Sequence, residues 1–128
     1  MIVSTSSIYV QEWTTWVPTF VGWTATPTYS ARYRIIGKMV EFQINVGTAS
    51  ASNSTATTFT LPVLPGANVV TPHNDFAYQP YNNGAFQAMG VARIYPAYSI
   101  CELYLSATIA WTASGNKAFF LVAQYEID

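Results

Sequence analysis

Residues Tyr29 to Thr48 read YSARYRIIGKMVEFQINVGT, and this stretch decides the fold. Apolar and polar residues alternate through it on both sides of Gly37-Lys38, with the period of two that is typical of half-buried β-strands. Glycine at the first central position suits a two-residue type II′ turn. The resulting antiparallel hairpin needs a second apolar layer to cover it. Its predicted cross-strand pairs are Ile35 with Val40, Tyr33 with Phe42, Ala31 with Ile44, and Arg34 with Glu41.

The composition of the 128-residue chain predicts one domain that associates with copies of itself. Charged residues make up only 9% of the chain, against roughly a quarter in an average soluble domain. Hydrophobic residues make up 51% and aromatic residues 16%. A chain with so few charges and so many rings is expected to hide part of its surface against other chains. No apolar run approaches the ~20 residues that cross a bilayer, so we expect no membrane insertion.

Charge and cysteine content argue against several classes of function. The net charge is −1 and the sequence pI is about 5.6, which gives no electrostatic footprint for nucleic acid. The single cysteine, Cys101, excludes an internal disulfide. One histidine and no Cys-x-x-Cys pair exclude a multi-histidine or zinc site within one protomer. We therefore expect neither a metal nor a cofactor.

The first part of the chain combines a weakly alternating start with a tryptophan-rich stretch. Residues 1–12 are predicted to be an N-terminal arm or edge strand, and residues 13–128 a single β-sandwich domain. Pro18 interrupts the tryptophan-rich stretch, which predicts a broken strand or an extended edge segment there. Its three tryptophans are expected to pack in the core or at an interface. A stacking platform for sugar rings is the alternative.

The last third reads as a series of strands. Residues 84–96 place Phe86, Ala88, Gly90, Ala92 and Ile94 on one face, and a turn at Pro96-Ala97 leads to a strand with Cys101 inward. Residues 107–112 and 117–127 flank a predicted hairpin turn at 113–116. Residues 118–123 are apolar on both faces, which predicts cover by the core and by another sheet or subunit. The predicted oligomer contacts are Trp13, Trp16, Phe119, Phe120, Leu121 and Val122.

Residues 64–83 are the least regular part of the sequence. Three prolines and four asparagines argue against both a helix and a central strand. Long irregular loops in compact domains are usually functional or interfacial, so this segment is the predicted ligand site. The predicted ligand-binding residues are His73, Asn74, Asp75, Tyr78 and Tyr81.

Signatures of catalysis are weak. Cys101 and His73 would make a nucleophilic pair if the fold brought them together, but Cys101 lies on an inward row, as a small core residue would. Among the carboxylates, Glu41 and Glu102 each have an arginine expected opposite them across a hairpin, which leaves little for glycoside hydrolysis. We expect no catalytic residues and no enzyme. No window has a capped helical period, and the short, turn-punctuated strands predict an all-β, antiparallel, two-sheet β-sandwich of jelly-roll type.

Three motifs carry a resemblance to a known family. They are Trp-x-x-Trp-x-Pro-x-Phe at 13–20, Tyr-Arg-Ile-Ile-Gly-Lys-x-Val-x-Phe at 33–42 and Phe-Thr-Leu-Pro at 59–62. Together they resemble a β-module of tailed-bacteriophage virion proteins, which is found in tail fibres, receptor-binding tips and head-fibre or minor structural proteins. The resemblance implies a homotrimer located in a virion that assembles in the bacterial host cytoplasm.

The expected function is that of a non-enzymatic virion structural protein. It would act as a tail-fibre or receptor-binding tip that recognises a host-surface saccharide or protein, with copies of itself and other virion proteins as partners. One alternative is a capsid decoration or head-fibre protein that binds the virion, and another is a stand-alone lectin-like carbohydrate-binding module. No shaft or coiled coil is visible ahead of residue 13, which predicts a separately expressed tip or a small stand-alone virion protein.

Overall fold

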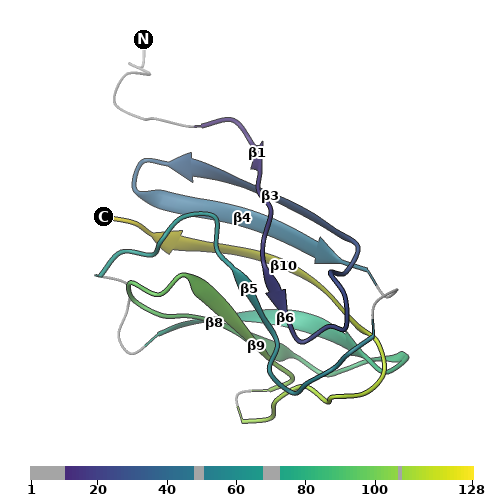
Figure 1. The fold of residues 1–128 in the computed structure, drawn as a ribbon. Coiled ribbons are helices and arrows are strands. Elements are labelled where there is room, and N and C mark those ends of the chain that lie inside the picture. The colour runs from purple at the N-terminus through teal and green to yellow at the C-terminus, as the bar shows by residue number, and fades with distance from the viewer. Residues whose placement is uncertain (1–10, 48–50, 68–72, 107) are drawn as a thin grey trace, which may run out of the picture.

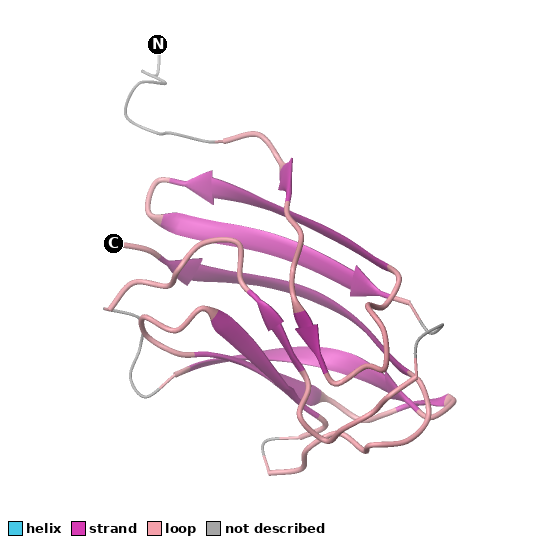
Figure 2. Ribbon diagram, viewed as in Figure 1, coloured by secondary structure: helices cyan, strands magenta, loops and turns pink. Residues whose placement is uncertain are grey.

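The computed structural model describes residues 11–47, 51–67, 73–106 and 108–128, and these form β-strands and no helix. All pairings are antiparallel, in the order β1-β3-β4-β10-β6-β8-β9-β5-β2, with β7 paired to β6 (Figures 1 and 2). The strands are β1 (Thr14–Thr15), β2 (Phe20–Val21), β3 (Tyr29–Ile36), β4 (Met39–Val46), β5 (Thr58–Thr60), β6 (Asn74–Asn82), β7 (Ala85–Phe86), β8 (Gly90–Ile94), β9 (Ile100–Tyr104) and β10 (Lys117–Glu126).

The sheet curls into a half-barrel, and its concave side holds the core. β5 lies far from β4 and β10 in the strand order. Even so, the ring of Phe59 on β5 lies 6.0 Å from the rings of both Phe42 on β4 and Phe119 on β10. All three side chains are almost fully buried. The prediction of an all-β antiparallel fold is confirmed.

The central hairpin has the predicted register. Gly37 has a φ of +61°, whereas Lys38 is not among the described residues with positive φ, as a type II′ turn requires. The inward row of β4 is almost fully buried. The observed pairs include Ile35 with Val40, Tyr33 with Phe42, Ala31 with Ile44, and Arg34 with Glu41.

One short segment connects the two ends of the strand order. β1 pairs with β3, and β2 pairs with β5, so residues 14–21 reach both edges of the curled sheet (Figure 1). Pro18 lies between the two pairings, and the break predicted there is confirmed. Trp16 adds to this link, because its indole N–H donates to the carbonyl of Thr60 at 3.0 Å.

The prediction of an irregular segment over residues 64–83 is wrong for its second half. Residues Asn74–Asn82 form β6, a central strand that pairs with β8, β7 and β10. Pro80 fits because it lies where β6 changes partners: the ladder with β8 ends at Tyr78, and that with β7 begins at Tyr81. The carbonyl of Pro80 accepts from the N–H of Gln87 on that side. The backbone N and O of one strand residue point to the same side of the strand. The nitrogen of Pro80, which has no hydrogen to donate, therefore faces the gap between the ladders with β8 and β7.

Two further expectations about the last third are also wrong. Residues 108–116 contain no strand, and β10 pairs with β4 and β6 instead of forming the predicted hairpin. Trp111 is buried from within this loop, so the apolar residues of the segment do not mark a strand face. Phe86 and Ala88 do not join the inward row. Phe86 is 71% exposed, because β7 ends there and the chain bends before β8 begins at Gly90.

Ile44 and Ile109 provide a matched pair that tests where the core lies. Ile44 is fully buried on β4, whereas Ile109 is 57% exposed in the loop before β10. We expect Ile44→Ala to lower the free energy of unfolding by about 2–5 kcal/mol because it leaves a cavity. Ile109→Ala should change it by less than about 0.5 kcal/mol. Chemical denaturation of both variants checks this, and equal losses would place the core elsewhere.

Candidate functional site

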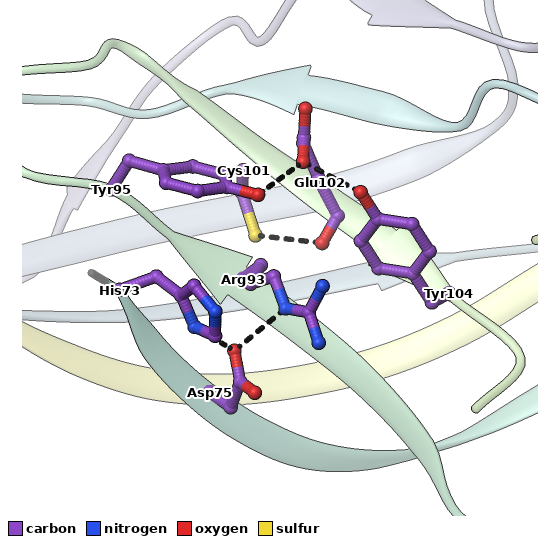
Figure 3. A network of polar contacts seen from close by, with 7 residues as sticks. All are labelled: His73, Asp75, Arg93, Tyr95, Cys101, Glu102 and Tyr104. Atoms are coloured by element: carbon purple, nitrogen blue, oxygen red, sulfur yellow. Dashed lines mark hydrogen bonds and ion pairs between the residues drawn. The ribbon is translucent and has the colours of Figure 1, made fainter. Parts of the chain in front are cut away.

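Polar and aromatic side chains gather on the outer face of β6, β8 and β9 (Figure 3). Asp75 on β6 lies opposite Arg93 on β8, and Arg93 lies opposite Glu102 on β9. The alternation that sends Ala92 and Leu103 into the core turns these three side chains outward. We call the group the polar cluster. Its members are His73, Asp75, Arg93, Tyr95, Glu102 and Tyr104.

Asp75 holds one half of the polar cluster together. Its Oδ1 accepts a hydrogen bond from Nε of Arg93 at 3.0 Å. Nδ1 of His73 lies 2.8 Å from the same oxygen, although it is not aligned as a hydrogen bond. The hydrogen bond from Arg93 to Asp75 raises the pKa of the guanidinium above its usual value. Both neighbours use Oδ1, so Oδ2 accepts no hydrogen bond from the described part of the chain.

Glu102 organises the other half in the same way. The hydroxyls of Tyr95 and Tyr104 both donate to its Oε1, at 2.9 and 2.7 Å. Burial and this carboxylate raise the pKa of both phenols, because the carboxylate favours the protonated hydroxyl. Arg93 lies over the ring of Tyr104 at 4.9 Å and so connects the two halves. The second carboxylate oxygen, Oε2, accepts no hydrogen bond from the described residues.

Aromatic rings border the polar cluster on one side. His73 meets Tyr95 edge to face at 5.5 Å, and Tyr95 lies 6.0 Å from Tyr98. Tyr98 is 43% exposed. Exposed tyrosine rings with fixed neighbours offer contact area at a low cost in side-chain entropy, which suits recognition.

The five predicted ligand-binding residues do not lie together. His73 and Asp75 belong to the polar cluster, whereas Asn74 alternates with Asp75 on the strand and faces the other way. Tyr78 is buried, and its hydroxyl donates to the carbonyl of Tyr104 and accepts from the indole of Trp111. Tyr81 lies near the opposite end of β6 and contacts Phe86.

Four members of the polar cluster were not predicted as site residues. They are Arg93, Tyr95, Glu102 and Tyr104. The signal that marks them is the alternation on both sides of Pro96-Ala97, which places them on the polar face of one hairpin. Only the expectation that Arg93 and Glu102 lie opposite each other used that signal, and the register confirms it.

Cys101 is separated from the polar cluster by the sheet itself. Its side chain is fully buried on the core side of β9, and burial raises the pKa of the thiol. A protonated, inaccessible thiol does not act as a nucleophile. His73 lies on the outer face, beside Asp75 and Tyr95.

A second surface feature is apolar. Phe120 and Val122 on the outer face of β10 are 54% and 47% exposed, and Phe86, which is 71% exposed, borders the same groove as Phe120. We call these three residues the apolar face. A groove of about 680 Å³ lies beside it, bordered by Asn45, Gln79, Tyr81, Phe86 and Phe120.

The six predicted oligomer contacts divide between the core and the surface. Phe119 and Leu121 are buried, and Trp16 packs against the core beside Phe42. Trp13 lies outside, with the guanidinium groups of Arg32 and Arg34 each 4.6 Å from its ring. Phe120 and Val122 face outward, so they are the members of this set whose apolar surface is left for a partner.

Lys117 at the start of β10 is buried in full, and its ammonium lies over the rings of Trp23 and Trp111. Burial lowers the pKa of this lysine to about 8. Neutral oxygens from two distant segments satisfy the amine and connect those segments to β10. They are the carbonyls of Gly22 (3.1 Å) and Ser54 (2.7 Å) and the hydroxyl of Thr57 (2.7 Å). Nothing local in the sequence marks this lysine as buried.

Among the described residues, no group of three or more histidine, cysteine, aspartate or glutamate side chains lies close enough to hold a metal ion. No helix formed by these residues could span a membrane.

Lys117 gives a prediction for the pH dependence of stability. We expect Lys117→Met to lower the free energy of unfolding by about 1–3 kcal/mol at pH 7, since buried acceptors lose their donor. The gap between wild type and variant should widen as pH rises from 8 to 10. In that range the unfolded state of the wild type holds a proton that the folded state has lost.

Denaturation of both proteins between pH 7 and pH 10 measures that gap. Cys101 and the buried tyrosines titrate in both proteins, so their effects cancel in the difference. Lys38→Met, in the exposed hairpin turn, is the control and should show no such trend. A constant gap would show that the buried amine keeps its proton throughout.

Comparison with known proteins yields no relative. No protein-family model matches the chain, and neither a curated protein nor a solved structure matches it. The resemblance to phage virion modules therefore stays a prediction from the three sequence motifs.

Proposed function

We propose that the protein is a non-enzymatic structural protein of a tailed-bacteriophage virion. It is a homotrimer of jelly-roll-like sandwiches and serves as a tip that recognises a host-surface saccharide or protein. The observation that carries the proposal is the apolar face formed by β7 and β10. β10 lies between β4 and β6 and has apolar side chains on both of its faces. The virion context is supported by the resemblance of residues 13–20, 33–42 and 59–62.

Self-association follows from what the apolar face presents to water. Phe86, Phe120 and Val122 leave large apolar surfaces exposed on one protomer. Each buried Å² of such surface is worth roughly 25 cal/mol, so contact between copies is favoured. The low charge content of the chain removes the repulsion that keeps many surfaces apart. A second copy is thus the partner that the composition and the apolar face both favour.

A sandwich arrangement is supported by the way β6 is shared. Its first half, Asn74 to Tyr78, pairs with β8, and its second half, Gln79 to Asn82, pairs with β10. The strands therefore divide into one group around β4 and β10 and another around β8 and β9. Rings from the two groups meet across the core.

A binding role is favoured over catalysis by the state of the reactive groups. Cys101 is buried and its pKa is raised. Asp75 and Glu102 each accept hydrogen bonds from their neighbours through one oxygen. These bonds hold the side chains of the polar cluster in fixed positions, which suits a binding surface.

Experiments distinguish the tip role from two alternatives, a capsid decoration or head-fibre protein and a stand-alone lectin. A capsid decoration or head-fibre protein should rebind capsids from which it has been stripped. A receptor-binding tip should instead adsorb to host cells and compete with infection. A stand-alone lectin should bind glycans as a monomer. Purified protein that neither adsorbs nor competes would remove the tip role.

The oligomer is tested by placing a charge on the apolar face. We expect light scattering after size exclusion to give a trimer for the wild type and smaller species for Phe120→Asp, because a buried unpaired carboxylate opposes association. Ile109→Asp is the matched control, since Ile109 is similarly exposed but belongs to the loop before β10 and not to the apolar face, and it should leave the trimer intact. A monomeric wild type, or an unchanged Phe120→Asp trimer, contradicts the proposal.

A further inference from the structure

We infer that the polar cluster is a binding site for a neutral saccharide. The inference rests on the proposed function and assigns the recognition step to the outer face of β6, β8 and β9. The chain has only five basic and six acidic side chains and one histidine. Two of the acids, one of the bases and the histidine meet on this one face.

The hydrogen-bonding capacity of the polar cluster points to a ligand that donates. Asp75 Oδ1 and Glu102 Oε1 already receive the contacts from their neighbours. The partner oxygens Oδ2 and Oε2 accept nothing from the described residues, and an ionised carboxylate can only accept. Hydroxyl groups are suitable donors, and a sugar presents several on one ring.

Spacing suits one ligand that touches both carboxylates. Asp75, Arg93 and Glu102 lie in register on three neighbouring strands. Neighbouring strands are about 4.8 Å apart, so the two acids lie roughly 10 Å apart at the backbone. Arg93 between them is held by Asp75 and by the ring of Tyr104. A mono- or disaccharide would span such a row.

Ring faces supply the apolar part of the contact. Tyr98 is exposed beside Tyr95, and His73 meets Tyr95 edge to face. Aromatic side chains pair an apolar face with a polar handle, which matches the C–H faces and hydroxyls of a sugar ring.

The charge of the polar cluster limits the ligand further. Two carboxylates and one guanidinium leave one net negative charge when His73 is neutral. An anionic sugar or a phosphate would meet repulsion there. A cation placed between the acids would meet Arg93. The arrangement therefore favours a neutral saccharide over acidic glycans and over basic peptides.

Saturation-transfer NMR and titration calorimetry on the full chain test the inference. The probes are a panel of neutral mono- and disaccharides, sialyllactose as the anionic probe and oligolysine as the cationic probe. We expect binding of a neutral sugar that is weakened at least about tenfold in Asp75→Asn and in Glu102→Gln, since each variant replaces the spare acceptor or its charge. Tyr98→Ala should weaken it as well without disturbing the ion pairs.

The control is Glu41→Gln, the same chemical change at a carboxylate on β4 that contacts Arg34 at 3.3 Å. It should leave sugar binding unchanged. Binding of only sialyllactose or only oligolysine, no binding of any neutral sugar, or full affinity in all three site variants would overturn the inference. Host adsorption without sugar binding would leave the proposed tip role standing and remove this assignment alone.

Discussion

The fold depends on aromatic contacts between strands that are not neighbours in the sheet. Phe59 on β5 stacks with Phe119 on β10 and meets Phe42 on β4, although several strands separate them in the hydrogen-bonded order. A flat sheet could not make these contacts, so the core rings require the curl. The segment that carries Trp16 then runs along the opening and bonds to both edges.

Curling also decides what each face of β10 contacts. Its inward row, which includes Phe119, Leu121 and Tyr125, is enclosed by the half-barrel. Its outward row keeps Phe120 and Val122 in contact with water. The polar cluster lies on different strands, β6, β8 and β9. The chain thus carries an apolar surface and a polar surface on separate elements, so the assembly and the recognition that we propose would not compete for one surface.

Local chemistry explains what the sequence could predict. Gly37 at a turn and strict alternation on both sides fix the register of β3 and β4, and Pro18 breaks the first strand wherever the chain goes next. The sequence did not predict β6, because a proline is compatible with a central strand only where that strand changes its pairing partner. For Pro80, this change depends on the positions of β7 and β8. Two of the six members of the polar cluster, His73 and Asp75, were predicted from their residue types. The other four members depend on a pairing across Pro96-Ala97, and the burial of Lys117 depends on oxygens from remote segments.

The burial of Lys117 has a practical consequence for chemical modification. The lysines of this chain are Lys38 and Lys117. Lys117 has no exposed surface, whereas Lys38 is exposed in the tight turn between β3 and β4. Amine-reactive dyes, cross-linkers and biosensor surfaces that react with lysine would therefore attach through that turn. Molecules immobilised through Lys38 would all be attached at the same end of the β3–β4 hairpin.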